Sequence, residues 1–175
     1  MMKLTEIVRK ILEAYFKNEE FELSKETKDK YKDKRACFVT LTKDGELRGC
    51  IGSLEARQEL WRDVQENAMN AAFNDSRFHP LTEDEFKEIK IEISILSQPK
   101  KLKAKNSQFL LDKIDKSIGL ILRKDHYSST FLPQVWEKIP NKEEFLEKLS
   151  LKAGLDKDEW KSSELWYYAV TIEEE

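Results

Sequence analysis

Apolar residues recur along this chain at two spacings, which predict helices in some segments and strands in others. From Leu4 to Phe16 they recur every three or four residues, which predicts an amphipathic first helix. The same spacing from Leu60 to Phe73 predicts a second helix, whose alanines favour close packing on a sheet. Isoleucine alternates strictly with polar residues from residue 89 to 95, so we expect a half-buried strand over residues 89–96, central in a sheet.

Turn-forming residues between β-prone segments predict two hairpins. The Asp-Gly pair at residues 44–45 is a strong two-residue turn signal between residues 36–42 and 47–52. A second hairpin is expected over residues 119–132, around the Lys-Asp-His sequence at 124–126. Hairpins favour antiparallel pairing, and the chain therefore reads as an α+β protein with a mainly antiparallel sheet flanked by helices.

The register of the first hairpin determines where the two cysteines lie. A plain two-residue turn places Val39 opposite Cys50, so that Cys37 and Cys50 share a face as a diagonal pair. Such a pair is about 7–8 Å apart, which is too far for a disulfide. Two cysteines without a C-x-x-C pattern also give no disulfide framework, and no run of apolar residues has the length of a signal peptide or a membrane span. We therefore expect a cytoplasmic protein with unbonded cysteines.

The remaining segments are assigned from residues that cap or end helices and from the distribution of charged residues. Residues 18–34 are mostly polar and are expected to form a loop with little structure of its own. The lysines of residues 100–105 are interpreted as a solvated linker, because no aromatic residue is interleaved with them. The further expected elements are a short helix from Thr82, a helix over residues 107–114, a helix from Asn141 to Gly154 and a closing strand over residues 165–172.

Composition limits the classes of partner and cofactor. Lys and Arg number 31 against 34 Asp and Glu, which gives a net charge of -3 and argues against nucleic acid as a partner. The two histidines, His79 and His126, lie far apart with no ligand spacing, so no metal is expected. No phosphate-binding loop, dinucleotide fingerprint or serine elbow is present, and the sequence leaves the identity of any cofactor unknown.

The Leu-Arg-Gly-Cys-Ile-Gly sequence at residues 47–52 is the strongest candidate for a functional segment. It contains two of the five glycines and one of the two cysteines, and its apolar members Leu47 and Ile51 could anchor it in a core. Arg48 brings a forked guanidinium suited to a carboxylate or phosphate, and Cys50 brings a thiol that is nucleophilic when ionised. A strand whose glycines relieve crowding, with a packed cysteine, is the alternative interpretation.

This segment and four others resemble the AMMECR-type domain family. The others are Asn-Ala-Ala at 70–72 leading into Asp-Ser-Arg-Phe at 75–78, Glu-Ile-Ser-Ile-Leu-Ser at 92–97, Phe-Leu-Pro-Gln-Val at 131–135 and Lys-Ala-Gly-Leu at 152–155. They occur in the order typical of the family and span nearly the whole chain. His79 stands where the family usually has proline.

The resemblance implies a single domain over residues 1–175 with a smaller second lobe. Bacterial relatives are similar to the A component of the AmmeMemoRadiSam system, so the resemblance implies Memo-type and radical S-adenosylmethionine proteins as partners. The reaction of the family is not established, and the resemblance therefore implies a fold more firmly than a function.

Two kinds of function are compatible with these residues. In an enzyme or enzyme subunit, Cys50 would be the nucleophile, although no base adjoins it in the sequence. In a non-enzymatic binding or adaptor module, the same surface would recognise a partner or small ligand through its arginines. A third, structural interpretation pairs Arg48 with Glu92 inside the protein. The residues expected to cluster around Cys50 are Arg48, Gly49, Gly52, Asp75, Arg77, Glu92 and Ser94.

Overall fold

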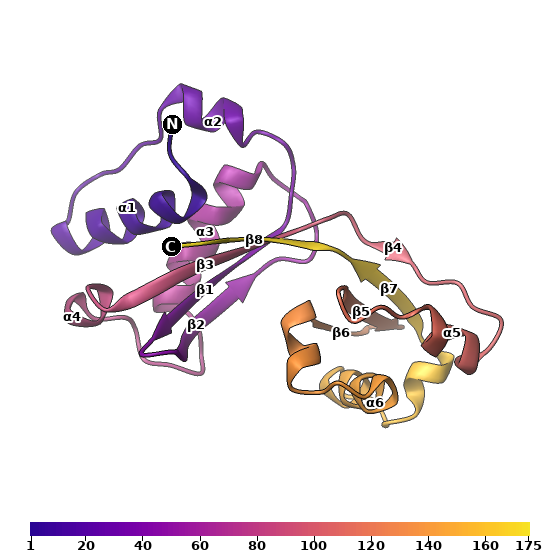
Figure 1. Ribbon diagram of the computed structural model, residues 1–175. Coiled ribbons are helices and arrows are strands. Elements are labelled where there is room, and N and C mark those ends of the chain that lie inside the picture. The colour runs from indigo at the N-terminus through magenta and orange to yellow at the C-terminus, as the bar shows by residue number, and fades with distance from the viewer. The chain divides into compact units, whose positions relative to one another are not determined.

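The computed structural model describes all residues from Met1 to Glu175, which form two compact units (Figure 1). Unit 1 consists of Met1–Leu96 and Thr171–Glu175, and unit 2 consists of Ser97–Val170. Each unit contains a four-stranded sheet with helices packed on it, and the predicted antiparallel α+β class is confirmed. None of the helices combines the length and the apolar character needed to cross a membrane.

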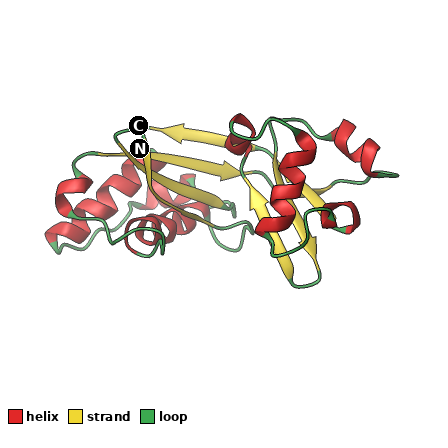
Figure 2. Ribbon diagram, turned by 90° about the horizontal axis from the view of Figure 1, so that it is seen from below, coloured by secondary structure: helices red, strands yellow, loops and turns green.

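Unit 1 has the strand order β2-β1-β3-β8, with helices covering one side of the sheet (Figure 2). The predicted isoleucine strand is β3, and it lies inside the sheet as expected. Its side chains Ile91 and Ile93 are fully buried with Val39 of β1 and with α1 and α3, and each contributes about 1.5–3 kcal/mol through burial. The elements are α1 (Leu4–Lys17), α2 (Lys25–Lys30), β1 (Cys37–Lys43), β2 (Glu46–Gly52), α3 (Leu60–Phe73), α4 (Glu83–Phe86), β3 (Ile89–Leu96) and β8 (Val170–Glu174).

A β-bulge in the first hairpin overturns the expected register. The turn forms as predicted, with Asp44 and Gly45 both at positive φ. Leu41 then pairs with Gly49 while Thr42 pairs with Leu47, so that Arg48 is the extra residue on β2. Because one added residue moves every later side chain to the other face, Cys50 lies opposite Thr40 rather than Val39. The thiols of Cys37 and Cys50 therefore lie on opposite faces of the sheet, and both are free.

The bulge also changes which residue of β2 enters the interior. The expectation that Leu47 would anchor the segment is wrong, since its side chain is 42 % exposed. Arg48 is buried instead, and Ile51 packs at the margin of the core. A leucine at the surface and an arginine in the interior reverse the usual preference, which indicates that Arg48 has specific partners.

Unit 2 has the strand order β4-β7-β5-β6 and its own core. Trp136 stacks on Phe145 at 3.6 Å between ring centroids, and its indole nitrogen donates to the carbonyl of Ile118. The second predicted hairpin and the helix stopped by Gly154, which has φ +85°, are confirmed. The elements are β4 (Lys100–Lys101), α5 (Ser107–Lys113), β5 (Gly119–Lys124), β6 (Tyr127–Phe131), the 3-10 helix η1 (Pro133–Glu137), α6 (Lys142–Lys152), the 3-10 helix η2 (Glu159–Ser162) and β7 (Glu164–Tyr168).

Three other expectations about secondary structure are wrong. Residues 18–34 contain the helix α2, whose first turn is capped by the hydroxyl of Ser24. The lysine segment starts with the short strand β4, which pairs with β7. The closing strand over residues 165–172 is two strands, and its break at Ala169 separates β7 of the second sheet from β8 of the first.

Candidate functional site

The loop after α3 binds the main chain of Cys50 on the outer edge of β2. A carboxylate oxygen of Asp75 accepts the amide of Cys50 at 2.9 Å, and Arg77 donates to the Cys50 carbonyl at 3.2 Å. Since β2 ends the sheet, these groups have no neighbouring strand to bind. Asp75 and Arg77 thus make the hydrogen bonds that a further strand would make with Cys50 at this edge.

Asp75 and Arg77 are also bound to each other. The guanidinium of Arg77 donates through Nε and Nη2 to the two oxygens of Asp75, at 3.0 and 2.7 Å. This pairing, together with the amide of Cys50, lowers the pKa of Asp75 to about 2. The Asp75 side chain is 4 % exposed whereas that of Arg77 is 54 % exposed. A buried carboxylate therefore holds an arginine that still faces solvent.

The thiol of Cys50 lies on the sheet face away from α1 and α3. Its Sγ is 3.2 Å from the hydroxyl of Thr40, and Thr40 in turn lies opposite Glu92 in the ladder. Side chains in such a row are neighbours, so Cys50, Thr40 and Glu92 share one patch of the sheet. Burial raises the pKa of the Cys50 thiol and outweighs the hydrogen bond of Thr40 and the charge of Arg77, which lower it, while the carboxylates of Asp75 and Glu92 add smaller increases. The thiol is therefore protonated at neutral pH.

The two glycines of the segment are required by close packing. A Cβ on Gly49 would lie 2.2 Å from the carbonyl oxygen of Ala71 in α3, and one on Gly52 would lie 2.3 Å from the ring of Phe38. Both distances are far inside van der Waals contact. Gly49 and Gly52 thus allow β2 to lie against α3 and β1, and their role in holding the site is structural.

Arg48 binds away from the Cys50 patch. Its Nε and Nη2 donate to both oxygens of Glu85 in α4, at 2.8 and 3.0 Å, and Nη2 also donates to the carbonyl of His79 at 2.8 Å. This arrangement lowers the pKa of Glu85 to about 2. Both side chains are largely buried, and the pair fixes α4 and the loop before it to the bulge in β2.

The structure brings most of the expected residues together. Asp75 and Arg77 contact Cys50 towards one end of β2. Glu92 lies on the same face of the sheet on β3, beyond Thr40 of β1, and Ser94 follows Glu92 on that face. The ion pair proposed for Arg48 and Glu92 is wrong, because Glu85 is the partner of Arg48. Glu85 carried no sequence signal for a contact with Arg48 other than its place in the short helix expected from Thr82. The structure shows that its side chain caps α4 and binds Arg48 at the same time.

A second buried carboxylate supports the other end of the hairpin. Asp63 of α3 accepts the main-chain amide of Cys37 at 2.9 Å and also the hydroxyl of Ser53. Asn67 donates to Asp63 and to the Cys37 carbonyl. The thiol of Cys37 is fully buried, and this burial together with the nearby Asp63 raises its pKa. Cys37 is therefore a packed residue of the core.

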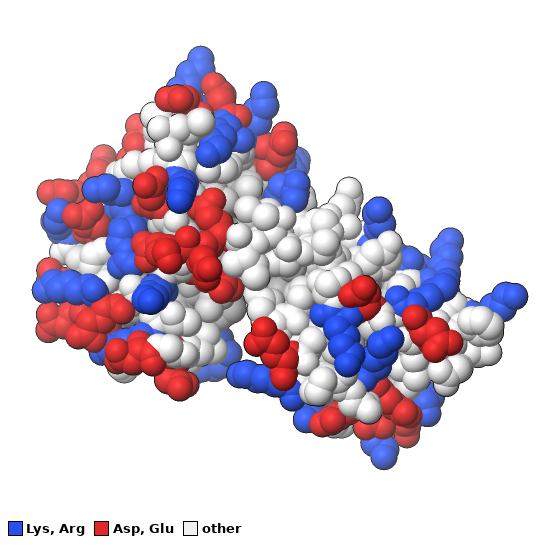
Figure 3. Space-filling view, viewed as in Figure 1, with Lys and Arg blue, Asp and Glu red and all other residues white.

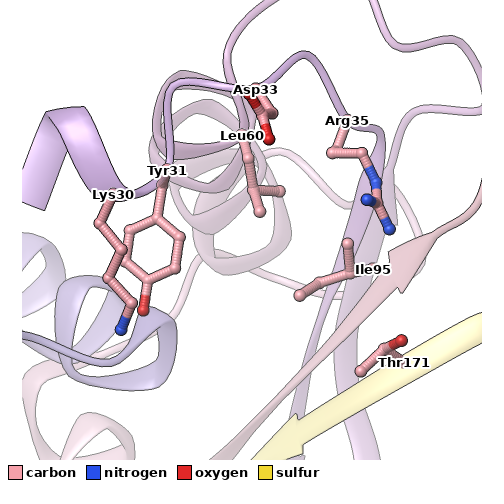
Figure 4. A pocket seen from close by; sticks show the side chains of 7 residues that line it. All are labelled: Lys30, Tyr31, Asp33, Arg35, Leu60, Ile95 and Thr171. Carbon is pink, nitrogen blue, oxygen red and sulfur yellow. The ribbon is translucent and has the colours of Figure 1, made fainter.

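Unit 1 also has a cavity of about 190 Å³ that sequence analysis did not indicate (Figure 4). Leu60 and Ile95 form its apolar part. The charged side chains of Lys30, Asp33 and Arg35 lie around these two residues. Arg35 also donates to the carbonyl of Leu96 at 3.2 Å. The cavity is lined by Lys30, Tyr31, Asp33, Arg35, Leu60, Ile95 and Thr171.

Comparison with known proteins identifies the family to which this chain belongs. The AMMECR1 family matches residues 5–173, which is nearly the whole chain, and the protein belongs to that family. The resemblance noted in its sequence segments is confirmed.

Two related proteins and one solved structure illustrate the similarity. Protein NEQ441 of Nanoarchaeum equitans is 38 % identical over 162 residues, covering 91 % of this chain and 90 % of that protein. Protein MK0488 of Methanopyrus kandleri is 39 % identical over 184 residues, covering 98 % of this chain and 87 % of that protein. The crystal structure of the uncharacterized protein PH0010 from Pyrococcus horikoshii matches with a TM-score of 0.89 at 31 % identity, covering 98 % of this chain and 89 % of that one.

Proposed function

We propose that this protein is a binding module that recognises an anionic group through Arg77, beside Cys50. The observation that carries the proposal is the contrast between Asp75, whose side chain is 4 % exposed, and Arg77, whose side chain is 54 % exposed. A guanidinium held on one edge by a buried carboxylate is preorganised, so little side-chain entropy is lost when its solvent-facing part binds a carboxylate or phosphate.

The state of the thiol favours recognition over nucleophilic catalysis. A cysteine nucleophile needs a lowered pKa or an adjacent base, whereas burial raises the pKa of Cys50 and its nearest polar group is the hydroxyl of Thr40. A protonated thiol is a weak donor on an otherwise polar patch. In this proposal Cys50 therefore shapes the surface and does not attack a substrate.

The candidate partners are the Memo-type and radical S-adenosylmethionine proteins that the family resemblance implies. An exposed acidic residue on such a protein would supply the anionic group that Arg77 binds. A hydrogen-bonded guanidinium at the centre of an interface is a frequent hot spot in protein recognition. The proposal assigns this role to Arg77.

Calorimetric titration of a Memo-type protein from the same organism tests this proposal. Replacing Arg77 with alanine should weaken binding by about tenfold or more, while Arg62→Ala should leave it unchanged. Arg62 is a matched control because its side chain is 58 % exposed and it also pairs with one carboxylate, that of Glu59. Cys50→Ser should bind like the wild type.

A second variant at the same position is needed in case Arg77→Ala destabilises the fold. If Arg77→Ala melts well below the wild-type protein, Arg77→Lys is the variant whose binding decides the test. Lysine retains the charge but not the forked geometry, so Arg77→Lys should still weaken binding. Equal affinities of the wild-type protein and both Arg77 variants would rule out the proposal, as would the absence of any binding by the wild-type protein.

A further inference from the structure

Unit 2 carries a strongly basic segment within a protein whose net charge is negative. Residues 100–116 contain six lysines and only two aspartates, whereas the whole chain has a net charge of -3. Lys101 is paired with Glu164 at 2.7 Å, but the other lysines of this segment form no ion pair with a carboxylate. Figure 3 shows basic side chains gathered over β4 and the loop that follows it.

Two adjoining hollows lie among these lysines. One has a volume of about 320 Å³ and is lined by the exposed ring of Phe109, and the other has about 420 Å³ and is lined by Tyr167 and Ile118. Lys103 and Lys113 line both hollows, which therefore adjoin, and the Lys113 ammonium donates to the Lys103 carbonyl. The two hollows together are called the groove. The Phe109 side chain is 51 % exposed, which is unusual for a phenylalanine on a helix whose other apolar residues, Leu110 and Leu111, are buried and partly buried.

We propose that this groove binds single-stranded nucleic acid. Lys103, Lys105 and Lys113 would bind successive phosphates, and a base would stack on the face of Phe109. The second hollow, beside Tyr167, has the size for another nucleotide, since ligand pockets begin at about 300 Å³. Lysines that lie beside accessible aromatic rings are the combination that single strands require, because each strand offers both phosphates and unstacked base faces.

The shape of the surface distinguishes this ligand from other polyanions. A duplex keeps its bases stacked and offers no free face to Phe109. A membrane surface needs a protruding apolar face, whereas here the aromatic rings line hollows. An acidic peptide would satisfy the lysines but leave the aromatic walls without a planar partner. The overall negative charge argued against nucleic acid only for the chain as a whole, and the structure shows that the basic residues and the rings are gathered in one place.

Fluorescence anisotropy with a labelled twelve-nucleotide oligouridylate tests the inference on the full chain. We expect binding at low salt, with a plot of log affinity against log salt of slope about -2, because three phosphate contacts on a single strand each contribute about 0.7. The triple variant Lys103→Gln, Lys105→Gln, Lys113→Gln should lose most of this slope and about tenfold or more in affinity. Phe109→Ala should lose about tenfold in affinity and retain the slope.

Matched variants elsewhere in unit 2 control for charge and for aromatic exposure. Lys138→Gln, Lys148→Gln, Lys157→Gln removes three exposed lysines, and Tyr127→Ala removes a ring that is 45 % exposed. Both should bind like the wild type. The inference is wrong if the wild-type protein fails to bind, if a duplex of the same length or anionic phospholipid vesicles bind more tightly, or if the groove variants and the controls behave alike.

Discussion

The carboxylate of Asp75 lies 2.9 Å from the main-chain nitrogen of Cys50, although 25 residues separate them. The same carboxylate holds Arg77, which reaches the Cys50 carbonyl. The loop after α3 therefore completes the main-chain hydrogen bonding of the edge strand β2 at Cys50. The thiol of this residue lies on the sheet face away from α1 and α3. This relationship fixes the distance between the thiol and the guanidinium, and it makes the geometry of the candidate site depend on a single buried acid.

Replacing Asp75 with alanine should lower the free energy of unfolding by about 2–4 kcal/mol. The variant leaves the Cys50 amide without its acceptor and Arg77 without its counter-charge. Urea denaturation monitored by circular dichroism measures the change. Asp84→Ala is the control, since the Asp84 side chain is 95 % exposed and its ion pair with Lys87 is a surface one. Equal losses in the two variants would contradict the role assigned to Asp75.

Stability should fall as the pH decreases from about 5 towards 2. The pKa values of Asp75 and Glu85 are about 2 in the folded protein, against ordinary values of 3.8 and 4.5. A lowered folded-state pKa means that the unfolded chain takes up protons first, so the stabilisation present above the unfolded pKa is lost as the pH falls through the folded one. Unfolding free energies measured at intervals between pH 7 and pH 2.5 test this.

The variant Glu85→Gln should show a shallower pH dependence than the wild type. It should be less stable at pH 7, because Arg48 loses its counter-charge, and the difference should narrow below pH 4. A wild-type stability that is constant across this range, or a gap that widens in acid, would mean that neither carboxylate is stabilised as described.

Arg48 should tolerate neither alanine nor lysine. Arg48→Ala leaves the largely buried Glu85 without a partner and should cost about 3–5 kcal/mol. Lysine keeps the charge but cannot bind both oxygens of Glu85 and the His79 carbonyl together, so we expect only partial recovery. Thermal melting of both variants beside Arg57→Ala measures this. Arg57, with its side chain 80 % exposed, should have almost no effect.

Local patterns predicted the strands and long helices, because period and turn chemistry are properties of adjacent residues. The isoleucine alternation placed β3, and Asp44 with Gly45 placed the first turn. The bulge at Arg48 was not predictable in this way. It depends on Glu85 and the His79 carbonyl, which are 37 and 31 residues away and give a buried guanidinium its partners. Without those contacts the plain register, with Leu47 inside, is the expected one.

The residues of the candidate site were predictable from the sequence, but their arrangement in space was not. The sequence segments indicated Cys50, Asp75, Arg77 and Glu92. The structure places Asp75 and Arg77 against Cys50, and Glu92 on the same face of the sheet two strands away. Which of them is buried followed from the fold alone, since Asp75 faces an edge strand and Arg77 faces solvent. Thr40 carried no local signal, because its position opposite Cys50 depends on the bulge.

The Cys50 thiol should react slowly with an alkylating reagent, and its rate should rise to a midpoint above pH 9. Burial and the nearby carboxylates raise its pKa above the ordinary 9.0. The measurement uses Cys37→Ala so that one thiol remains, and Cys50→Ser confirms that the fully buried Cys37 is silent. Thr40→Val should move the midpoint to still higher pH, because the Thr40 hydroxyl bonds to the sulfur and lowers its pKa. A rapid reaction with a midpoint below pH 7.5 would contradict this prediction and would favour a cysteine nucleophile over a recognition surface.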